Sequence, residues 1–447
     1  MEAPLVTLFT TCKAFEGENA VMQRNALNSW ATLDLPILLI GDDPGTREQA
    51  SAIGAKHLAQ VKTNEHGTPL ISDLFTVAKT ATTTPFLAYI NSDIILTQDF
   101  FKVVQTLKGR NSHQPTLAVT RRFNIPNTPL NFEKNWQRTL SVQASRYGSW
   151  DKDNAIDLFL FNRELFSDIP DFAIGRMQWD NWLLWKAQNE KATIIDCSLE
   201  LTPYHPIHGY YGKNASWLTI NQGGEATENR RIAQGLSCSI NDVCTHALTD
   251  KGIQPLSEGI KQRVEMHCKQ DTEKEFIAGV EYLSSIKLPP EDKIECIKTL
   301  LWRRGKYFPF TFSPSFIESS VIKEAKTLAI AGQVNESESL LQDTLNELLI
   351  NELKLQYQKN RPIFIWGAGT FGRMAKSILE SRQITLSGAL DSNAASLRML
   401  DGIEVFPPEH VLNSKHKPYI LITTMYADDV VKQLVKHNYQ EALDYAL

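Results

Sequence analysis

Three consecutive polar residues, Asn91, Ser92 and Asp93, interrupt an apolar stretch in a way that suits metal chemistry. The run Phe86–Ile90 precedes them and Ile94–Leu96 follows them, so we expect the triplet at the end of a buried strand. Asn91 and Asp93 lie two residues apart, and on an extended chain they point to the same side. A carboxylate beside an aliphatic strand is costly to bury unless a cation or several donors compensate it. The pair could therefore hold Mg²⁺ or Mn²⁺, which take oxygen ligands from carboxylates and from substrate phosphates.

The alternative for this triplet is a turn that ends a strand, with its side chains bonded to the local backbone. The neighbouring strand ends favour a ligand site. Strands expected at Leu5–Thr10 and Pro36–Ile40 also end in polar residues. In open α/β sheets, ligands bind outside the carboxyl ends of the strands. The residues that we expect to bind one diphosphate-bearing ligand at this edge are Thr10, Thr11, Asp42, Asn91 and Asp93.

Basic residues could complete such a site, because arginine presents a planar fork that matches phosphate oxygens. Arg24 has the best position, since it lies in the helix expected after the first strand. Lys13, Arg121 and Arg122 are further candidates, and a solvated surface charge is the alternative for each of them.

Asp180 is the candidate general base. It falls where a loop is expected to turn into a helix, beside Trp179 and Trp182, whose rings could stack on a sugar. The alternative is an N-cap, because aspartate at that position bonds free backbone N–H groups and contributes about 1 kcal/mol. The spacing of Trp182 and Trp185, about one helical turn, is also typical of core packing.

Two histidines, His205 and His208, lie in a loop that proline and glycine interrupt. Either could give a divalent ion a further ligand, and imidazole suits Mn²⁺ better than Mg²⁺. The alternative is that both are polar surface residues.

A second chemical motif occurs near the end of the chain. Gly367, Gly369 and Gly372 form a G-x-G-x-x-G pattern after an expected strand and before an expected helix, and Asp391 follows a second strand. This setting predicts nucleotide binding. The alternative is that the glycines only let a helix pack tightly on a strand. A Tyr-x-x-x-Lys pair is absent from the roughly 75 residues that follow, which are too few for a dehydrogenase substrate domain, so hydride transfer is not expected.

The elements divide into three regions. Residues 1–245 alternate strand and helix patterns, which predicts an α/β layer fold with a largely parallel sheet. Residues 246–358 are rich in Glu, Lys, Leu and Ile at helical spacing and predict a helical connector without catalytic residues. Residues 359–447 predict a small second α/β domain.

The composition limits the possible classes of protein. The chain has 447 residues, 42% hydrophobic and 22% charged, and a net charge of -5. The acidic balance argues against a nucleic-acid partner. We expect a cytoplasmic protein without a membrane span, because the first residues carry no basic leader and no apolar run approaches 18 residues. The six cysteines show no C-x-x-C spacing, so neither disulfides nor a structural zinc site is expected.

These segments resemble glycosyltransferase-like proteins of the GT-A, or nucleotide-diphospho-sugar transferase, fold. The segments that carry the resemblance are Thr7–Thr11, Gln23–Ala26, Asn64–Pro69, Tyr89–Ile94, Ala173–Arg176 and Trp179–Trp182. The resemblance covers about residues 1–235. It implies a mixed sheet flanked by helices. The terminal segments Phe364–Gly372 and Gly402–Glu409 are similar to Rossmann-like parallel-sheet domains appended to sugar-modifying enzymes.

The resemblance also implies roles for individual residues. Asn91-Ser92-Asp93 matches the Asp-x-Asp segment that coordinates metal and diphosphate, with an amide in place of the first carboxylate. Asp180 matches the base that deprotonates the acceptor in inverting enzymes, and His205 or His208 matches a histidine that completes the metal site.

The sequence therefore predicts an inverting, metal-assisted transferase that moves a sugar from a nucleoside-diphosphate sugar to a carbohydrate or other hydroxyl acceptor in bacterial glycan assembly. One alternative is a non-catalytic nucleotide-sugar sensor or scaffold, which the amide at Asn91 favours. A sugar-1-phosphate nucleotidyltransferase is a weaker alternative, because Thr10–Phe15 lacks the glycine-rich basic loop of that class.

Overall fold

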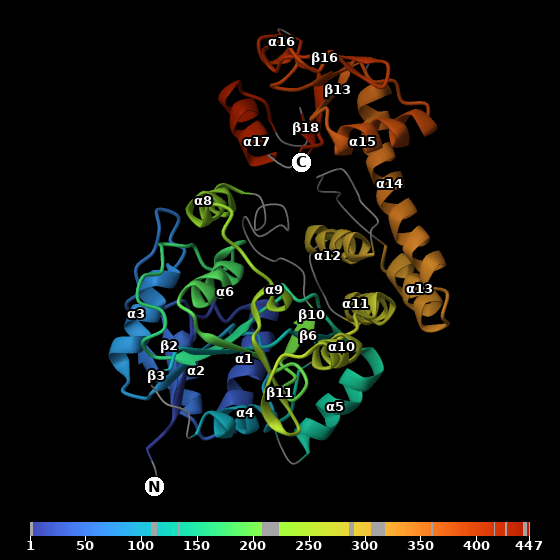
Figure 1. The fold of residues 1–447 in the computed structure, drawn as a ribbon. Coiled ribbons are helices and arrows are strands. Elements are labelled where there is room, and N and C mark those ends of the chain that lie inside the picture. The colour runs from blue at the N-terminus through green and yellow to red at the C-terminus, as the bar shows by residue number, and fades with distance from the viewer. Residues whose placement is uncertain are drawn as a thin grey trace. The chain divides into compact units, whose positions relative to one another are not determined.

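The computed structural model describes residues 3–108, 114–127, 129–132, 135–207, 223–285, 290–304, 318–358, 361–414, 416–424, 427–440 and 445–446. The chain divides into two compact units. The first contains residues 1–208 and 225–278, and the second contains residues 209–224 and 279–447 (Figure 1).

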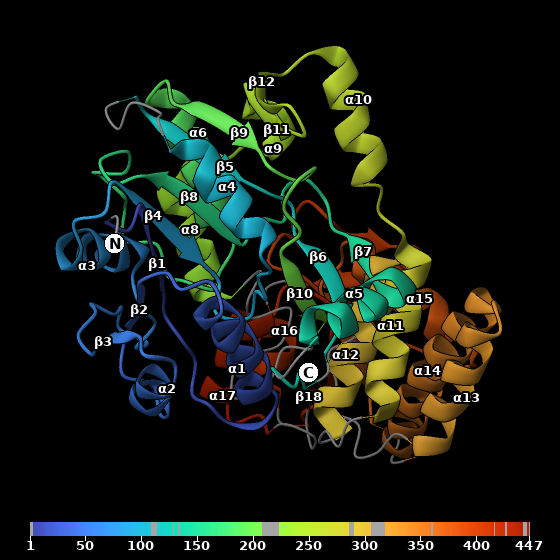
Figure 2. The same cartoon turned by 90° about the horizontal axis from the view of Figure 1, so that it is seen from below.

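The first unit is built on a nine-stranded sheet with the strand order β12-β11-β9-β5-β8-β4-β1-β2-β3. Figure 2 shows these strands side by side in this order. Strand β8 is antiparallel to β4 and β5, and β12 is antiparallel to β11, whereas the other pairs are parallel. The predicted mixed sheet is therefore confirmed. Its strands are β1 (Val6–Thr10), β2 (Ile37–Ile40), β3 (Lys56–Leu58), β4 (Phe86–Ile90), β5 (Thr116–Val119), β8 (Leu158–Asn162), β9 (Thr193–Asp196), β11 (His246–Thr249) and β12 (Gly252–Pro255).

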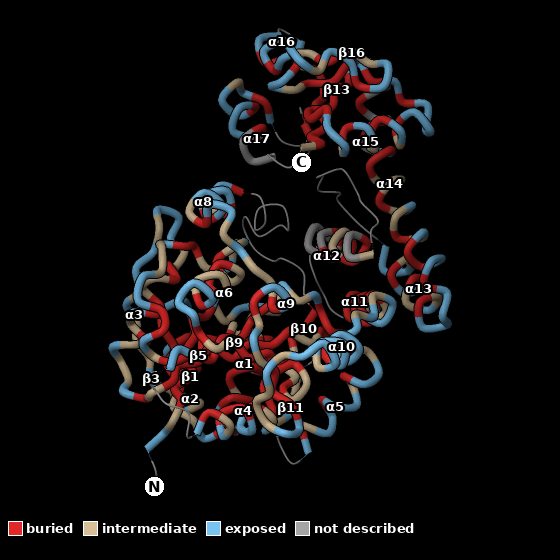
Figure 3. Tube along the Cα trace, in the orientation of Figure 1, coloured by how far each residue is buried: buried red, intermediate tan, exposed pale blue. Residues whose placement is uncertain are grey.

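Helices cover both faces of this sheet because its central strands are apolar on both sides (Figure 3). Successive side chains alternate between two cores. Phe9 and Tyr89 belong to the core that contains α3 (Ile71–Ala81) and α6 (Trp179–Asn189). Leu8 and Ile90 belong to the opposite core. Its helices are α1 (Gly17–Ala31), α2 (Thr46–Ile53) and α4 (Asp99–Leu107).

A small second sheet has the order β10-β6-β7. Its strands are β6 (Phe123–Pro126), β7 (Ser149–Trp150) and β10 (Tyr204–Ile207). Strands β6 and β10 are parallel, and their register pairs Asn124 with His205. The remaining helices that lie at least half in this unit are α5 (Trp136–Tyr147), α8 (Gly224–Ala233), α9 (Ile240–Val243), α10 (Glu258–His267) and α11 (Thr272–Ser285).

Among the described residues of the second unit, the helices α12 (Pro290–Arg303), α13 (Ser319–Ile330) and α14 (Val334–Gln358) precede its sheet. The sheet has six strands in the order β15-β16-β14-β13-β17-β18, and all its neighbouring pairs except β15 with β16 are parallel. The strands are β13 (Ile363–Trp366), β14 (Gly388–Leu390), β15 (Met399–Leu400), β16 (Ile403–Phe406), β17 (Tyr419–Ile422) and β18 (Tyr445–Ala446). The helices among them are α15 (Thr370–Ser381), α16 (Glu409–Leu412) and α17 (Ala427–Lys436).

The turn between β13 and α15 leaves no room for a side chain at Gly372. A Cβ added there would lie 2.1 Å from the carbonyl oxygen of Gly367, whereas a Cβ at Gly369 would meet no atom within 4 Å. We expect Gly372→Ala to destabilise the second unit by about 1–3 kcal/mol, because the helix would have to move off the strand. Hydrogen exchange in residues 363–381 should then become faster. Gly369→Ala is the matched control and should exchange like the wild type, and equal exchange in both variants would contradict this close packing.

Candidate active site

The carboxyl ends of β1, β2 and β4 lie at one edge of the large sheet, because the three strands are parallel neighbours. We call this the strand-end edge; it comprises residues 10–13, 41–43 and 91–93. The antiparallel strand β8 starts at the same edge, where Asn91 N donates to Asp157 O over 2.9 Å. Polar residues from four strands are therefore brought together there.

Gln23 joins two segments of the strand-end edge, a role that sequence reasoning missed. Its side chain is only 3% exposed. Its Oε1 accepts hydrogen bonds from Lys13 N at 2.7 Å and from Ser92 Oγ at 3.1 Å, and its Nε2 donates to Lys13 O at 2.9 Å. Gln23 shares the buried side of α1 with two other polar residues, Asn25 and Ser29, so its sequence position alone did not single it out.

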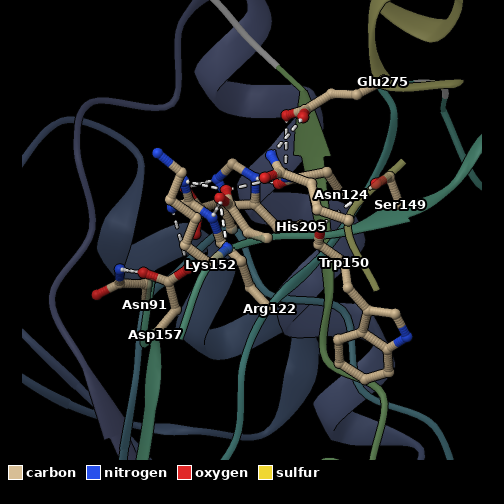
Figure 4. Close-up of polar contacts among 12 residues, drawn as sticks. Asn91, Arg122, Asn124, Ser149, Trp150, Lys152, Asp157, His205 and Glu275 are labelled. Atoms are coloured by element: carbon tan, nitrogen blue, oxygen red, sulfur yellow. Dashed lines mark hydrogen bonds and ion pairs between the residues drawn. The ribbon is translucent and has the colours of Figure 1, made fainter. Parts of the chain in front are cut away.

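Both ends of the Asn91 amide contact protein groups, and Figure 4 shows the contact of its nitrogen with Asp157. Its Oδ1 accepts a hydrogen bond from Tyr89 Oη at 2.8 Å, and its Nδ2 donates to Asp157 Oδ1 at 2.6 Å. Asp157 is in turn paired with Arg122, whose Nη1 lies 3.3 Å from Asp157 Oδ2. Because protein groups already occupy both ends of the Asn91 amide, this residue orients the triplet. Asp93 is therefore the stronger of the two proposed metal ligands.

His205 faces Asp93, with Nε2 3.8 Å from Asp93 Oδ2. The backbone brings the two residues together, because Ile95 and Tyr204 exchange hydrogen bonds of 2.9 and 3.1 Å in an isolated antiparallel bridge. His205 is 7% exposed and lies in strand β10 rather than in an open loop. His208 lies outside the described residues.

The donor set at Asp93 and His205 fits a divalent cation that takes its other ligands from substrate. With metal–ligand distances of about 2.1 Å, adjacent octahedral ligands are about 3 Å apart and opposite ones about 4.2 Å. The observed 3.8 Å lies between these two distances, so a small shift of either side chain would let both groups bind one ion. In the part of the chain that the structure describes, no group of three or more His, Cys, Asp or Glu could hold a metal ion. Phosphate and water oxygens would have to supply the remaining ligands.

Asp180 lies in the first turn of α6, which begins at Trp179. The N-cap is Gln178, with a left-handed φ of 86°, so the N-cap interpretation of Asp180 is wrong. Asp180 Oδ1 accepts the N–H of Asn181 at 2.9 Å. Burial, helped by the nearby charge of Asp157, raises the pKa of Asp180 to about 7. A carboxylate with this pKa is suited to general base catalysis near neutral pH.

The Tyr89 hydroxyl lies near several carboxylates of the site. Burial raises the pKa of Tyr89 well above its usual value, and the charges of Asp157, Asp93 and Asp180 contribute to this rise. Trp179 also contacts Tyr89, with ring centroids 5.3 Å apart, and lies in the core together with Trp182. These two rings are packing residues rather than a sugar platform.

The raised pKa of Asp180 predicts a pH-dependent stability difference. The folded chain holds the Asp180 proton up to about pH 7, whereas the ordinary pKa is 3.8, so stability falls as the pH rises from about 4 to 7. Asp180→Asn should therefore stabilise the protein at pH 8, by up to about 4 kcal/mol for three pKa units, and have little effect near pH 4. Thermal unfolding at both pH values measures this difference. A difference that does not depend on pH would contradict the raised pKa.

The other predicted residues of the strand-end edge differ in accessibility. Thr10 and Thr11 are buried, and Thr10 Oγ1 donates to Thr11 O at 3.2 Å. Asp42 is exposed, and its Oδ1 lies 3.3 Å from His57 Nε2. Arg24 is exposed on α1, next to the buried Gln23. Lys13 is also exposed at the surface, but it lies close to the triplet: desolvation by neighbouring atoms lowers its pKa, and the charge of Asp93 opposes that shift.

The loop that leads to Asp180 is fastened by Glu225 of α8. Glu225 Oε2 pairs with Arg176 Nη2 at 2.5 Å, and Glu225 Oε1 accepts from Asn64 Nδ2 at 2.6 Å. Asn64 and Arg176 both lie in segments that carry the family resemblance. Their common partner Glu225 could not be predicted, because it is distant from both in the chain.

In the second unit, Asp391 stabilises the glycine turn. Its Oδ2 accepts the N–H of Ala368 at 3.0 Å, and its Oδ1 accepts the N–H of Asn393 at 2.9 Å. Gly367 has a left-handed φ of 120°, Gly369 is the N-cap of α15, and Gly372 packs against Gly367. Asp391 already serves the turn itself, so nucleotide binding by these four residues remains a prediction.

Comparison with known proteins gives structural similarities only. No protein-family model matches the chain, and no curated protein matches its sequence. The glucosyl-3-phosphoglycerate synthase of Mycobacterium tuberculosis, in complex with Mg²⁺ and UDP, is 15% identical, with 46% of this chain and 72% of that chain covered and a TM-score of 0.30. S. aureus TarS 1-349 in complex with UDP-GlcNAc is 12% identical, with 76% of this chain and 91% of that chain covered and a TM-score of 0.34.

A longer TarS structure from S. aureus is 13% identical, with 76% of this chain and 55% of that chain covered and a TM-score of 0.33.

Within the described residues, no helix combines the length and the apolar character that crossing a membrane requires.

Proposed function

We propose that the chain is a glycosyltransferase that moves a sugar from a nucleoside-diphosphate sugar to a hydroxyl acceptor. The observation that carries the proposal is the cluster at the strand-end edge. There Asp93 Oδ2 lies 3.8 Å from Nε2 of His205, which comes from β10. Asp180 of α6, a half-buried aspartate of pKa about 7, lies near enough to Asp157 of the same edge to be affected by its charge. A site of this kind offers one group for taking a proton and another for an anionic leaving group.

In the proposed reaction, Asp180 accepts the proton of the acceptor hydroxyl as its oxygen attacks the anomeric carbon. The new bond forms between that oxygen and the carbon, the bond to the diphosphate oxygen breaks, and the nucleoside diphosphate leaves with the electron pair. Attack opposite the leaving group inverts the anomeric centre, which is the outcome we propose.

Asp93 and His205 are the residues that would hold a divalent cation, Mg²⁺ or Mn²⁺. The cation, when bound, neutralises negative charge that develops on the departing diphosphate. Lys13 would add a second positive charge near Asp93. Asn91 would orient the segment, since Tyr89 and Asp157 bind its amide.

A donor panel tests the proposal. The purified chain is incubated with UDP-, GDP- and dTDP-linked sugars and Mn²⁺, with and without hydroxyl acceptors, and released nucleoside diphosphate is measured. We expect release with one donor class, faster with an acceptor, and lost on addition of EDTA. Binding of a donor without any release would instead indicate a non-catalytic nucleotide-sugar sensor.

The proposal also assigns a role to each of the three regions of the chain. We propose residues 1–245 as the transferase domain, 246–358 as a connector and 359–447 as a Rossmann-like domain. Strands β11 and β12, residues 246–255, extend the large sheet of the first unit, so the helical part of the connector begins after them. In that last domain the strand order reverses beside β13, between β14 and β17. A crevice at such a point is where open parallel sheets bind ligands, and this supports a nucleotide as the ligand of the glycine turn.

A further inference from the structure

We propose that Glu275, in α11, is a positioning residue that controls the proposed metal ligand His205 through Asn124. The proposal rests on the proposed function, because it concerns a residue assigned to the same metal site. Glu275 belongs to the region for which the sequence predicted a helical connector without catalytic residues.

The first step is the contact between Asn124 and His205. The register of β6 and β10 places them side by side, and His205 Nδ1 lies 3.0 Å from Asn124 Oδ1. An amide oxygen only accepts, so the ring nitrogen that faces it must carry the proton.

The second step fixes which end of the Asn124 amide faces the ring. Its Nδ2 donates to Asp151 Oδ2 at 2.9 Å and to Glu275 Oε1 at 3.1 Å (Figure 4). A flipped amide would turn its oxygen toward both carboxylates and lose both hydrogen bonds. The two acidic residues therefore hold the amide oxygen toward His205.

The third step concerns the far side of the imidazole. With the proton on Nδ1, a neutral ring has its lone pair on Nε2, the atom that lies 3.8 Å from Asp93 Oδ2. A metal-binding histidine needs this lone pair, and in metal sites its other nitrogen usually donates to a fixed acceptor. Asn124 supplies that acceptor, and Asp151 and Glu275 orient it.

Glu275 is well placed for this role because α11 is anchored where it starts. Glu275 is 1% exposed, and its Oε2 accepts from Gln270 Nε2 at 3.3 Å. Asp271 comes directly before the first residue of α11. Its N–H donates to Ser149 Oγ at 2.7 Å, and this bond attaches the start of the helix to β7. A carboxylate buried this deeply needs partners, and Asn124 is one of them.

The tautomer of His205 gives a test that does not depend on activity. Long-range ¹⁵N–¹H correlation of protein labelled at histidine should show His205 protonated at Nδ1, with the signal assigned by its absence in His205→Gln. We expect Glu275→Ala to lose this single-tautomer pattern, whereas Glu275→Gln, which keeps an acceptor oxygen, should retain it. A His205 signal protonated at Nε2 in the wild type would overturn the proposal whether or not any variant folds.

Binding of Mn²⁺ in the presence of UDP, followed by electron paramagnetic resonance, separates this proposal from the proposed function. Glu275→Ala should weaken binding by about 10–100-fold, the usual effect of losing such a partner. Glu273→Ala, an exposed position of the same helix, is the matched control and should bind like the wild type. Unchanged binding in His205→Ala would refute the metal site itself. Loss in His205→Ala with unchanged binding in Glu275→Ala would refute only the role of Glu275.

Discussion

Replacing Asp180 with asparagine should lower the rate of sugar transfer by about two to four orders of magnitude, the usual contribution of a general base. Asparagine keeps the size of the side chain and its oxygen near Asn181 N, but it cannot take a proton. The wild-type rate should rise with pH through about 7, since the base is ionised above its pKa. Released nucleoside diphosphate, measured with saturating donor and acceptor between pH 5 and 9, gives both quantities.

The control for this variant is Asp168→Asn, an exposed aspartate that precedes the same loop. It should retain the wild-type rate and pH profile. Undiminished transfer by Asp180→Asn would refute its role as the base and leave the raised pKa as a purely structural property.

Replacing Asp93 with asparagine should lower transfer by about two to three orders of magnitude and weaken Mn²⁺ binding as well. The substitution leaves an amide, a weaker ligand than a carboxylate, opposite His205, so the remaining donor set carries no negative charge. A metal that stabilises a leaving group contributes several kcal/mol, and each 1.36 kcal/mol corresponds to a factor of ten in rate. Titration with Mn²⁺ in the presence of UDP, followed by rate measurement at saturating metal, separates binding from turnover.

High concentrations of Mn²⁺ should restore part of the rate of Asp93→Asn, but none of that of Asp180→Asn. This contrast distinguishes a metal ligand from a proton acceptor. If Asp93→Asn bound Mn²⁺ and turned over like the wild type, the assignment of Asp93 would be wrong.

The sheet of the first unit could be predicted because each of its strands is specified by a short stretch of neighbouring residues. Apolar runs such as Phe86–Ile90 specify buried strands, and the rule that parallel strands share their carboxyl ends brings Thr11, Asp42 and Asp93 to one edge. The helix start near Asp180 also follows from a local change of pattern, although the capping residue is Gln178.

The polar contacts within the site could not be predicted, because they depend on partners far apart in the chain. The sequence around Asn91 indicates a metal ligand. The structure shows that its amide nitrogen donates to Asp157, which lies 66 residues later in the chain. Glu275 is one of many acidic residues in a charged helical region, and only the fold shows that it is buried beside Asn124. Spacing alone also gave no reason to expect His205 within 4 Å of Asp93.

The bridge between Ile95 and Tyr204 has a consequence for how this site can vary. It joins the segment that carries Asp93 to the strand that carries His205 by main-chain hydrogen bonds in both directions. The backbone separation of these two segments is thus set by atoms common to every amino acid except proline, whose backbone lacks the N–H. Homologous or engineered chains could therefore exchange the side chains at 95 and 204, within the core packing that buries Ile95, while the backbones that carry the two donors keep their separation.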